Sequence, residues 1–166
     1  MGLRQGAPMV GRERILSLLD RWKSWSATPA KMRSLLVEAS WELLRARLLV
    51  AFSLRKTLPR VLKPGSTEAT NPPEQLCRDV RYIIWLAARN VPWRSLCLPN
   101  AIAAQRMLSR RGYASTLHLG VGHHADGAPH AHAWLEAAGY IVTGQDGMQA
   151  VTPLPYSAAT GQLDKA

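Results

Sequence analysis

Two short stretches decide the expected fold and raise the question of function: "SLCLPNA", Ser95 to Ala101, and "PHAHAWLE", Pro129 to Glu136. In the first, Cys97 stands at the beginning of a predicted helix, and Pro99 fits its first turn. The second follows the period of two that is typical of a short strand, and it carries a pair of histidines. These are either ordinary core and loop residues or the two halves of a cysteine nucleophile site.

The sequence predicts two long helices ahead of the cysteine. The first runs from Ala30 to about Leu62, with apolar and charged residues on opposite faces: Leu36, Ala39, Leu43 and Ala46 on one, Lys31, Glu38, Glu42 and Arg45 on the other. Such an amphipathic helix must dock on something, and we expect the rest of the same chain, with a membrane or a second protein as alternatives. The second helix, within "PEQLCRDVRYIIWLAARN", has Cys77 as a small structural thiol beside a buried stripe of Leu76, Val80, Ile83, Ile84 and Ala87.

After the cysteine, the pattern changes from helix to strand. Ser95 is the expected N-cap of the helix that holds Cys97, and Gly112 is expected to end that helix. Three short strands then follow in "ASTLHLGVG", "HAHAWLEA" and "GYIVTG", the last two joined by a tight turn at Ala138–Gly139. The sequence therefore predicts an α+β fold in which helices precede a small antiparallel sheet.

The turn-rich stretch "KPGSTEATNPP", Lys63 to Pro73, is the strongest boundary in the chain. We therefore expect a basic helical N-terminal region at residues 1–66 and a core at residues 67–166. Residues 1–66 hold 13 Lys and Arg against 4 Asp and Glu, which is +9 of the total net charge of +10. A basic segment of this kind suits nucleic acid, an anionic membrane, an acidic protein or peptide, or no dedicated partner at all.

The composition favours a cytoplasmic protein. The 2 cysteines among 166 residues are too few for a disulfide framework, which suits a reducing compartment. The opening "MGLRQGAPMVGRER" lacks the apolar core of a secretory signal. The longest uncharged apolar runs, "LLVAFSL" and "YIIWLAA", fall far short of the roughly 20 residues that span a bilayer. Contact with a membrane surface stays open.

Cys97 and the histidines after it offer the parts of a cysteine nucleophile site. The unpaired amides and the dipole at a helix N-terminus favour a thiolate and can also face the oxyanion formed during acyl transfer. His130 and His132 are two apart on a predicted strand, so both point the same way, and one of them could serve as base and acid for Cys97. A third group must orient the imidazole. Asp146 follows the next strand, and Glu136 is nearer in sequence.

Two other interpretations of the histidines stay open at this point. Enough nitrogen and oxygen ligands for zinc are offered by His123, His124, Asp126, His130 and His132. Their spacing matches no zinc signature, which makes a metal site the weaker alternative. The remaining interpretation is that the histidines are ordinary residues of a loop and a strand.

The segment from about Asp79 to Pro155 resembles the transglutaminase-like cysteine peptidases of lasso-peptide biosynthesis, the B-type leader peptidases. The matching stretches are "PWRSLCLPNAIAAQRMLSRRGYASTLHLGVG" and "HAHAWLEAAGYIVTG", and "LLVEASWELLRARLLVAF" is similar to the helical region that precedes the core in this family. The resemblance implies a papain-like core with Cys97 as the nucleophile, at the N-terminus of a helix packed on the sheet. It implies His132, the histidine of "HAWLE", as the general base and acid.

The other candidates are less firmly matched. His130 lies outside the family motif and at most supports His132. Asp146 is the nearest match to the acidic residue of the family, although a T-G-Q turn intervenes. The orienting role is therefore open between Asp146, Glu136 and a backbone carbonyl.

The resemblance also implies a biological role. Cys97 would attack the leader–core junction of a ribosomally made precursor peptide and form a thioester, and water would release the leader, without a metal or another cofactor. A separate ATP-using cyclase would then close the freed core into a macrolactam. Residues 1–66 lack the strand pattern of a winged-helix leader-binding module, so we expect a stand-alone peptidase that needs a separate leader-recognition protein. The basic segment is expected to contact that protein or the cyclase rather than nucleic acid. Alternatives are amine transfer at the same site, as in a transglutaminase or amide ligase, or a non-catalytic scaffold.

Overall fold

The computed structural model describes residues 29–61, 69–123, 127–154, 156–157 and 162–163. The chain divides into two compact units, Met1–Leu35 and Leu36–Ala166. The features that follow belong to the second unit, except residues 30–35, which begin the first helix and fall in the first unit. The boundary expected at residues 66 and 67 falls outside the described residues and stays a prediction. Within the described residues, no helix is long and apolar enough to cross a membrane.

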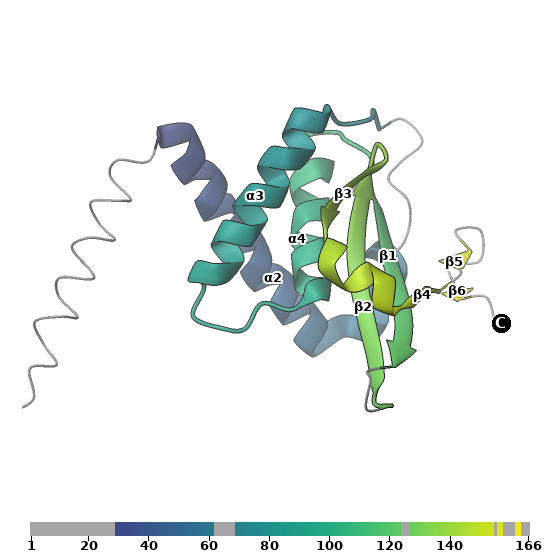
Figure 1. The fold of residues 1–166 in the computed structure, drawn as a ribbon. Helices are drawn as coiled ribbons and strands as arrows, with labels where there is room; N and C mark the ends of the chain where they lie inside the picture. The colour runs from purple at the N-terminus through teal and green to yellow at the C-terminus, as the bar shows by residue number, and fades with distance from the viewer. Residues whose placement is uncertain (1–28, 62–68, 124–126, 155, 158–161, 164–166) are drawn as a thin grey trace, which may run out of the picture. The chain divides into compact units, whose positions relative to one another are not determined.

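The second unit has the predicted α+β architecture, with helices followed by a small antiparallel sheet (Figure 1). The helices are α2 (Ala30–Val61), α3 (Glu74–Asn90) and α4 (Cys97–Ser109). The sheet has the order β3-β2-β1-β4, formed by β1 (Thr116–His123), β2 (Pro129–Ala137), β3 (Tyr140–Thr143) and β4 (Thr152–Pro153). A short 3₁₀ helix, η1 (Gln145–Ala150), joins β3 to β4, and β5 (Tyr156–Ser157) and β6 (Gln162–Leu163) form a separate pair.

The strands lie in the predicted segments because the turn residues and the alternation of apolar and polar residues both favour antiparallel hairpins. The connection between β2 and β3 is the expected tight turn at Ala138 and Gly139, where φ is 51° and 77°. Two successive residues with positive φ are typical of the type I′ turn, whose twist suits an antiparallel hairpin. β1 pairs with β2 over the whole length of β1, which sets His132 opposite Gly120.

Helix α4 begins at Cys97, as predicted, but its cap differs from the expectation. The N-cap residue is Leu96, and no side chain caps the helix. The prediction that Ser95 caps it is wrong, because the Ser95 hydroxyl hydrogen-bonds the Asn100 side chain instead. At the other end, Gly112 takes a φ of 78°, and the chain turns out of the helix there as predicted.

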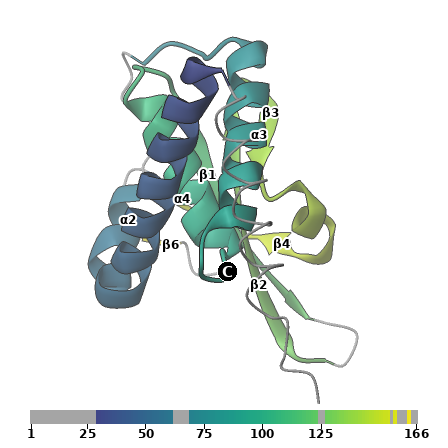
Figure 2. The ribbon, with the colours of Figure 1, turned by 90° about the vertical axis from the view of Figure 1, so that its left-hand side faces the viewer.

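The core lies between α3, α4 and the sheet, which lie side by side in Figures 1 and 2. The buried stripe of α3 matches the prediction at Val80, Ile83, Ile84 and Ala87, but the fifth position is Cys77 rather than Leu76. Cys77 is fully buried, and its burial raises the pKa of the thiol. Burying each large aliphatic side chain contributes about 1.5–3 kcal/mol, so this seam stabilises both helices on the sheet.

Helix α2 buries Ala39, Leu43 and Ala46, as its apolar pattern predicts. The expectation that Glu42 faces away from the core is wrong, because its side chain is 0 % exposed. Arg106 of α4 donates a hydrogen bond to Glu42 at 2.6 Å, and the Arg110 guanidinium lies 3.0 Å from the other carboxylate oxygen. The polar side of α2 therefore also meets α4.

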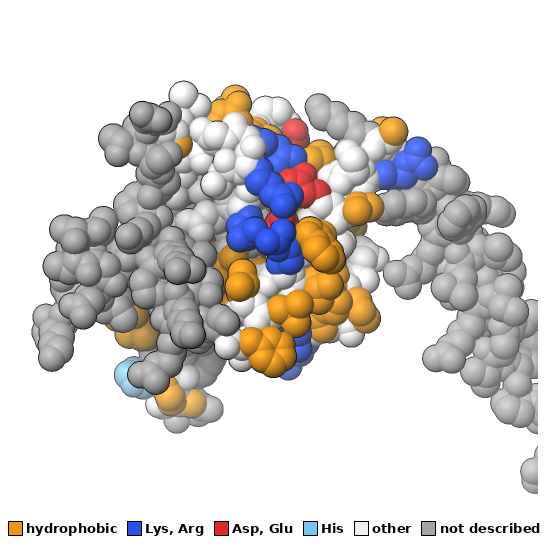
Figure 3. Space-filling model, turned by 180° about the vertical axis from the view of Figure 1, so that it is seen from behind, with side chains coloured by type: hydrophobic (Ala, Val, Ile, Leu, Met, Phe, Trp, Pro, Cys, Tyr) orange, Lys and Arg blue, Asp and Glu red, His pale blue; other side chains and the backbone are white. Residues whose placement is uncertain are grey.

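Helix α2 carries a second paired carboxylate, Glu38, and a set of exposed apolar side chains. Arg111, in the turn that follows α4, donates to both oxygens of Glu38, at 3.0 and 2.7 Å. Among the α2 side chains that the structure describes, the exposed large apolar ones are Val37, Trp41, Leu48 and Phe52. Figure 3 shows the charged cluster with an apolar patch beside it. α2 thus presents part of its apolar surface outward and its carboxylates to arginines at and just after the end of α4.

Candidate active site

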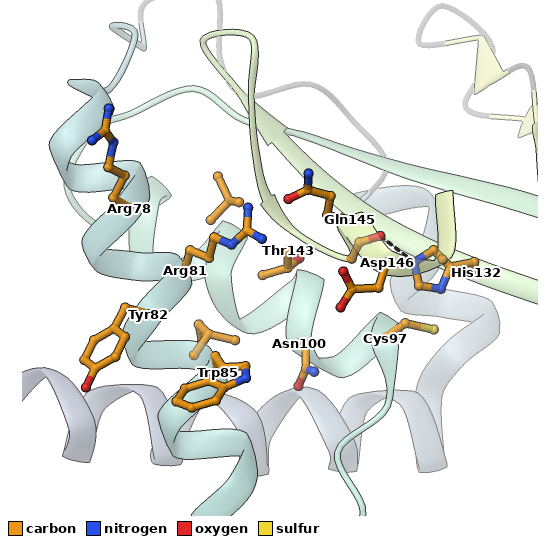
Figure 4. A pocket seen from close by; sticks show the side chains of 14 residues that line it. Arg78, Arg81, Tyr82, Trp85, Cys97, Asn100, His132, Thr143, Gln145 and Asp146 are labelled. Carbon is orange, nitrogen blue, oxygen red and sulfur yellow. Dashed lines mark hydrogen bonds between the residues drawn. The ribbon is translucent and has the colours of Figure 1, made fainter. Parts of the chain in front are cut away.

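The predicted nucleophile, base and acidic residue line one cleft, with a volume of about 670 Å³ (Figure 4). Its walls come from α3, the start of α4, β2, and the segment from β3 into η1. The described residues that line it are Arg78, Arg81, Tyr82, Ile84, Trp85, Cys97, Asn100, His132, Val142, Thr143, Gly144, Gln145, Asp146 and Gly147. The cleft thus joins residues that lie up to 69 positions apart, from Arg78 to Gly147.

Cys97 is the first residue of α4, and its side chain is half-buried. The first amides of a helix have no intrahelical partner. The third residue of this helix is Pro99, which has no N–H, and the amide of Asn100 donates to Leu96. The amides of Cys97 and Leu98 are therefore the donors that the helix start offers. They can face the oxyanion that forms on a carbonyl oxygen when the Cys97 sulfur adds to its carbon.

His132 is held by a backbone carbonyl. Its Nε2 atom lies 2.7 Å from the carbonyl oxygen of Gly144. Because a carbonyl oxygen only accepts hydrogen bonds, this contact requires the proton on Nε2 and leaves the lone pair on Nδ1. Of the three orienting groups that the sequence left open, a backbone carbonyl is the one that contacts His132 in this structure, directly after β3.

Glycine is required at position 144 for this contact. Gly144 has a φ of 83°, and a Cβ built there would lie 2.6 Å from the carbonyl oxygen of Ala133. An alanine at this position would be strained and would also clash with β2. The chain can therefore bring its carbonyl to His132 only with a glycine at this turn.

Gly147 packs directly against the His132 ring. A Cβ on Gly147 would lie 2.5 Å from Cε1 and 2.6 Å from each ring nitrogen. Sequence reasoning missed both Gly144 and Gly147. The signal was the pair of glycines in "GQDG", directly after the predicted strand.

Asp146 lies in the cleft but does not touch His132. It is an exposed residue in the first turn of η1, and in Figure 4 its carboxylate points away from the imidazole. Among the described residues, no hydrogen bond or ion pair links Asp146 to His132. The structure thus brings Asp146 to the site, while its orienting role stays a prediction.

The structure does not bring Glu136 to the cleft. Its Oε2 lies 3.3 Å from Nε2 of His118, which occupies the neighbouring strand. His130 stacks on His132 with ring centroids 6.1 Å apart, and Trp134 stacks on the other side at 6.4 Å. His132 therefore stands in a row of rings along β2, and a supporting role for His130 stays a prediction.

Comparison with known families agrees with this arrangement. The family described as the Transglutaminase-like superfamily matches residues 40–155, which is more than half of the chain. The chain belongs to the transglutaminase-like superfamily. No curated protein and no solved structure matches it. A transglutaminase-like fold is commonly a cysteine peptidase or an acyltransferase, and both form a thioester on a cysteine.

The zinc alternative gains no support from the described part of this transglutaminase-like chain. There, no group of three or more His, Cys, Asp and Glu side chains is placed to hold a metal ion. His123 is exposed at the end of β1. His124 and Asp126 lie outside the described residues.

One wall of the transglutaminase-like cleft was not anticipated from the sequence. It is formed by Arg78, Arg81, Tyr82 and Trp85 of α3. These residues follow the spacing i, i+3, i+4, i+7, so they form one face of the helix beside its buried stripe. That spacing was visible in the sequence, but only the position of α3 shows that this face meets a cleft.

Proposed function

We propose that this protein is a cysteine peptidase that removes the leader from a ribosomally made lasso-peptide precursor in the cytoplasm. One observation carries the proposal: Cys97 at a helix N-terminus and His132, held by a carbonyl, line the same cleft. Membership of the transglutaminase-like superfamily supports thioester chemistry at Cys97. The resemblance of "SLCLPNA" and "HAHAWLE" to leader peptidases supports the choice of substrate.

The first half of the reaction forms a thioester. His132 accepts the thiol proton at Nδ1, and the sulfur of Cys97 adds to the carbonyl carbon at the leader–core junction. The amides of Cys97 and Leu98 stabilise the tetrahedral oxyanion. As the intermediate collapses, the C–N bond breaks and His132 returns the proton to the departing amine. The core leaves with a free N-terminus, and the leader stays on Cys97.

The second half hydrolyses the thioester. His132 takes a proton from a water molecule, whose oxygen adds to the thioester carbonyl. The carbon–sulfur bond then breaks, the leader leaves as a carboxylic acid, and the proton returns to Cys97. Throughout both halves, the carbonyl of Gly144 keeps the proton on Nε2 and so keeps Nδ1 available.

The direct test is mass spectrometry of a lasso-type precursor incubated with its leader-recognition protein and this protein. Wild-type protein is expected to give separate leader and core peptides, and Cys97→Ala only intact precursor. Cys77→Ala is a matched control, because Cys77 is fully buried away from the cleft lining. Equal cleavage by wild-type and Cys97→Ala protein would remove Cys97 as the nucleophile.

A second candidate keeps the thioester but transfers the acyl group to an amine. Transglutaminase chemistry in the same superfamily favours considering it. The product mass separates the two, because hydrolysis adds one water across a bond whereas transfer joins two substrates. Intact precursor with both wild-type and Cys97→Ala protein would instead support a non-catalytic scaffold.

We further propose that the leader is presented by a separate winged-helix recognition protein. The basic N-terminal region is the proposed contact for that protein or for the ATP-dependent cyclase. Its net charge of +9 over residues 1–66 favours an acidic partner surface. Cleavage of the precursor is expected to be much slower without the recognition protein. Cleavage by the lone protein as fast as with its partner would disprove this requirement.

A further inference from the structure

The α3 wall of the cleft carries two arginines in different situations. Arg78 is exposed and already paired, because Glu74 lies 2.5 Å from its guanidinium. Arg81 is half-buried, and its Nη1 donates to the carbonyl oxygen of Ile141 at 3.3 Å. Among the described residues, no carboxylate forms an ion pair with Arg81. Arg81 therefore brings an unneutralised positive charge to the cleft.

A second polar group beside this charge also lacks a partner. Thr143 lines the same cleft, and its hydroxyl oxygen is buried without a hydrogen-bond partner among the described residues. It lies two residues after Ile141, the residue that Arg81 contacts, on the same edge strand. Buried hydroxyls are normally hydrogen-bonded, so this one points to a group that arrives with a ligand.

The neighbouring side chains make the cleft suitable for a peptide. Tyr82 and Trp85 stack with ring centroids 6.1 Å apart, and both are about half exposed, at 50 % and 52 %. Aromatic rings of this kind cover the apolar part of a bound peptide. Asp146 is the carboxylate among the described lining residues, and it lies next to Gly147, which packs on His132. Because Asp146 forms no ion pair with Arg81 among the described residues, the Arg81 guanidinium can still receive a negative charge from a ligand.

We propose that Arg81 and Thr143 form a subsite for the carboxylate of an Asp or Glu side chain close to the cleaved bond. The guanidinium donates to one or both carboxylate oxygens, and the Thr143 hydroxyl donates to one of them. The inference rests on the proposed function, because it takes the cleft to hold a peptide. It goes further by naming an acidic residue near the junction as part of the substrate.

The test uses two small probes rather than a precursor. N-chloroacetyl aspartate amide and N-chloroacetyl asparagine amide differ only in the carboxylate, and each alkylates a cysteine by displacement of chloride. The alkylation rate of Cys97 is measured with both by intact-protein mass spectrometry, with free cysteine as the reference. For Cys97 we take the alkylation rate with the aspartate probe over the rate with the asparagine probe, and divide it by the same ratio measured with free cysteine. This normalised ratio is expected to be about five in the wild-type protein.

Three variants locate the effect. Arg81→Gln is expected to return the normalised ratio to about one, and the isosteric Thr143→Val to lower it by about half. Arg78→Gln removes the same formal charge from the same helix face, and it is the matched control that leaves the ratio unchanged. Arg81→Glu is expected to bring the ratio below one.

Each outcome decides the proposal. It is overturned by a wild-type ratio of one, by an equal loss in Arg78→Gln, or by a Cys97 that reacts with neither probe. The result is separate from precursor cleavage. A protein that cleaves its precursor but shows no preference for the aspartate probe overturns the subsite alone. A preference for the aspartate probe without precursor cleavage counts against the peptidase and leaves an anion subsite beside Cys97.

Discussion

Replacing Gly147 by alanine tests whether the position of His132 controls the reaction. The added Cβ would lie 2.5 Å from Cε1 of His132, whereas ordinary carbon contacts begin near 3.4 Å, so the ring must move by about 1 Å. A shift of that size breaks the 2.7 Å contact with the Gly144 carbonyl. Misplacement of a catalytic group by about 1 Å is worth roughly a hundredfold in rate. We expect kcat for precursor cleavage to fall by about that factor.

The matched control is Gly139→Ala in the β2–β3 turn. Gly139 has a φ of 77° but open space around the position of a Cβ, so alanine there strains the backbone without touching His132. It is expected to reduce the free energy of unfolding by about 1 kcal/mol and to leave kcat unchanged while the protein is folded. Cleavage kinetics and urea unfolding are measured for both variants. Wild-type kcat in Gly147→Ala would refute the claim that this glycine positions the base.

Three further predictions concern charge and burial. Glu42→Gln is expected to lower the free energy of unfolding, measured in urea, by about 2–3 kcal/mol, because it removes the buried carboxylate that pairs with Arg106. The control is Glu74→Gln, which breaks the exposed pair with Arg78 and leaves the urea midpoint unchanged. Burial raises the pKa of the Cys77 thiol above its ordinary value of 9.0, so this thiol ionises at lower pH in the unfolded chain than in the folded protein. The free energy of unfolding is therefore expected to fall as the pH rises past 9.0, and Cys77→Ala removes this part of its pH dependence. Asp146→Asn is expected to lower kcat by less than about tenfold, against roughly 10⁴-fold for a carboxylate that holds the histidine.

Much of the fold was predictable because local signals agree with the tertiary structure. The period of two in "HAHAWLEA" and the turn residues Ala138 and Gly139 determine a hairpin without help from distant residues. Local patterns do not place Cys97 beside His132, since their closeness depends on α4 packing on β2. Local sequence is enough to predict the start of a helix or a strand, but the packing of the core decides whether the two come into contact.

Other features could not be predicted because they depend on partners far away in the sequence. Glu42 was assigned outward since a charged residue in an amphipathic pattern normally faces water. Arg106 and Arg110, more than 60 residues later, make its burial tolerable. The Gly144 carbonyl was harder still, because a backbone oxygen is present at every position and only the fold selects the one that meets His132.

The use of a carbonyl rather than a carboxylate on Nε2 has an electrostatic consequence. A carbonyl fixes the proton on the ring, but it carries no full charge to balance the imidazolium that forms when His132 accepts a proton. The nearest full negative charge available in the cleft is Asp146, which is exposed and separated from the ring. Its influence on His132 should therefore pass through space and be screened by salt.

This separates two ways in which Asp146 can matter. If Asp146 acts only through its charge, the difference in kcat between wild-type and Asp146→Asn protein shrinks as ionic strength rises from about 0.01 to about 0.5 M, where the Debye length falls from about 30 Å to a few ångströms. If the carboxylate swings to hold His132 during the reaction, the loss is large and persists at high salt, because a direct hydrogen bond is screened little. A salt-insensitive loss near 10⁴-fold would therefore give the orienting role to Asp146 in place of the Gly144 carbonyl.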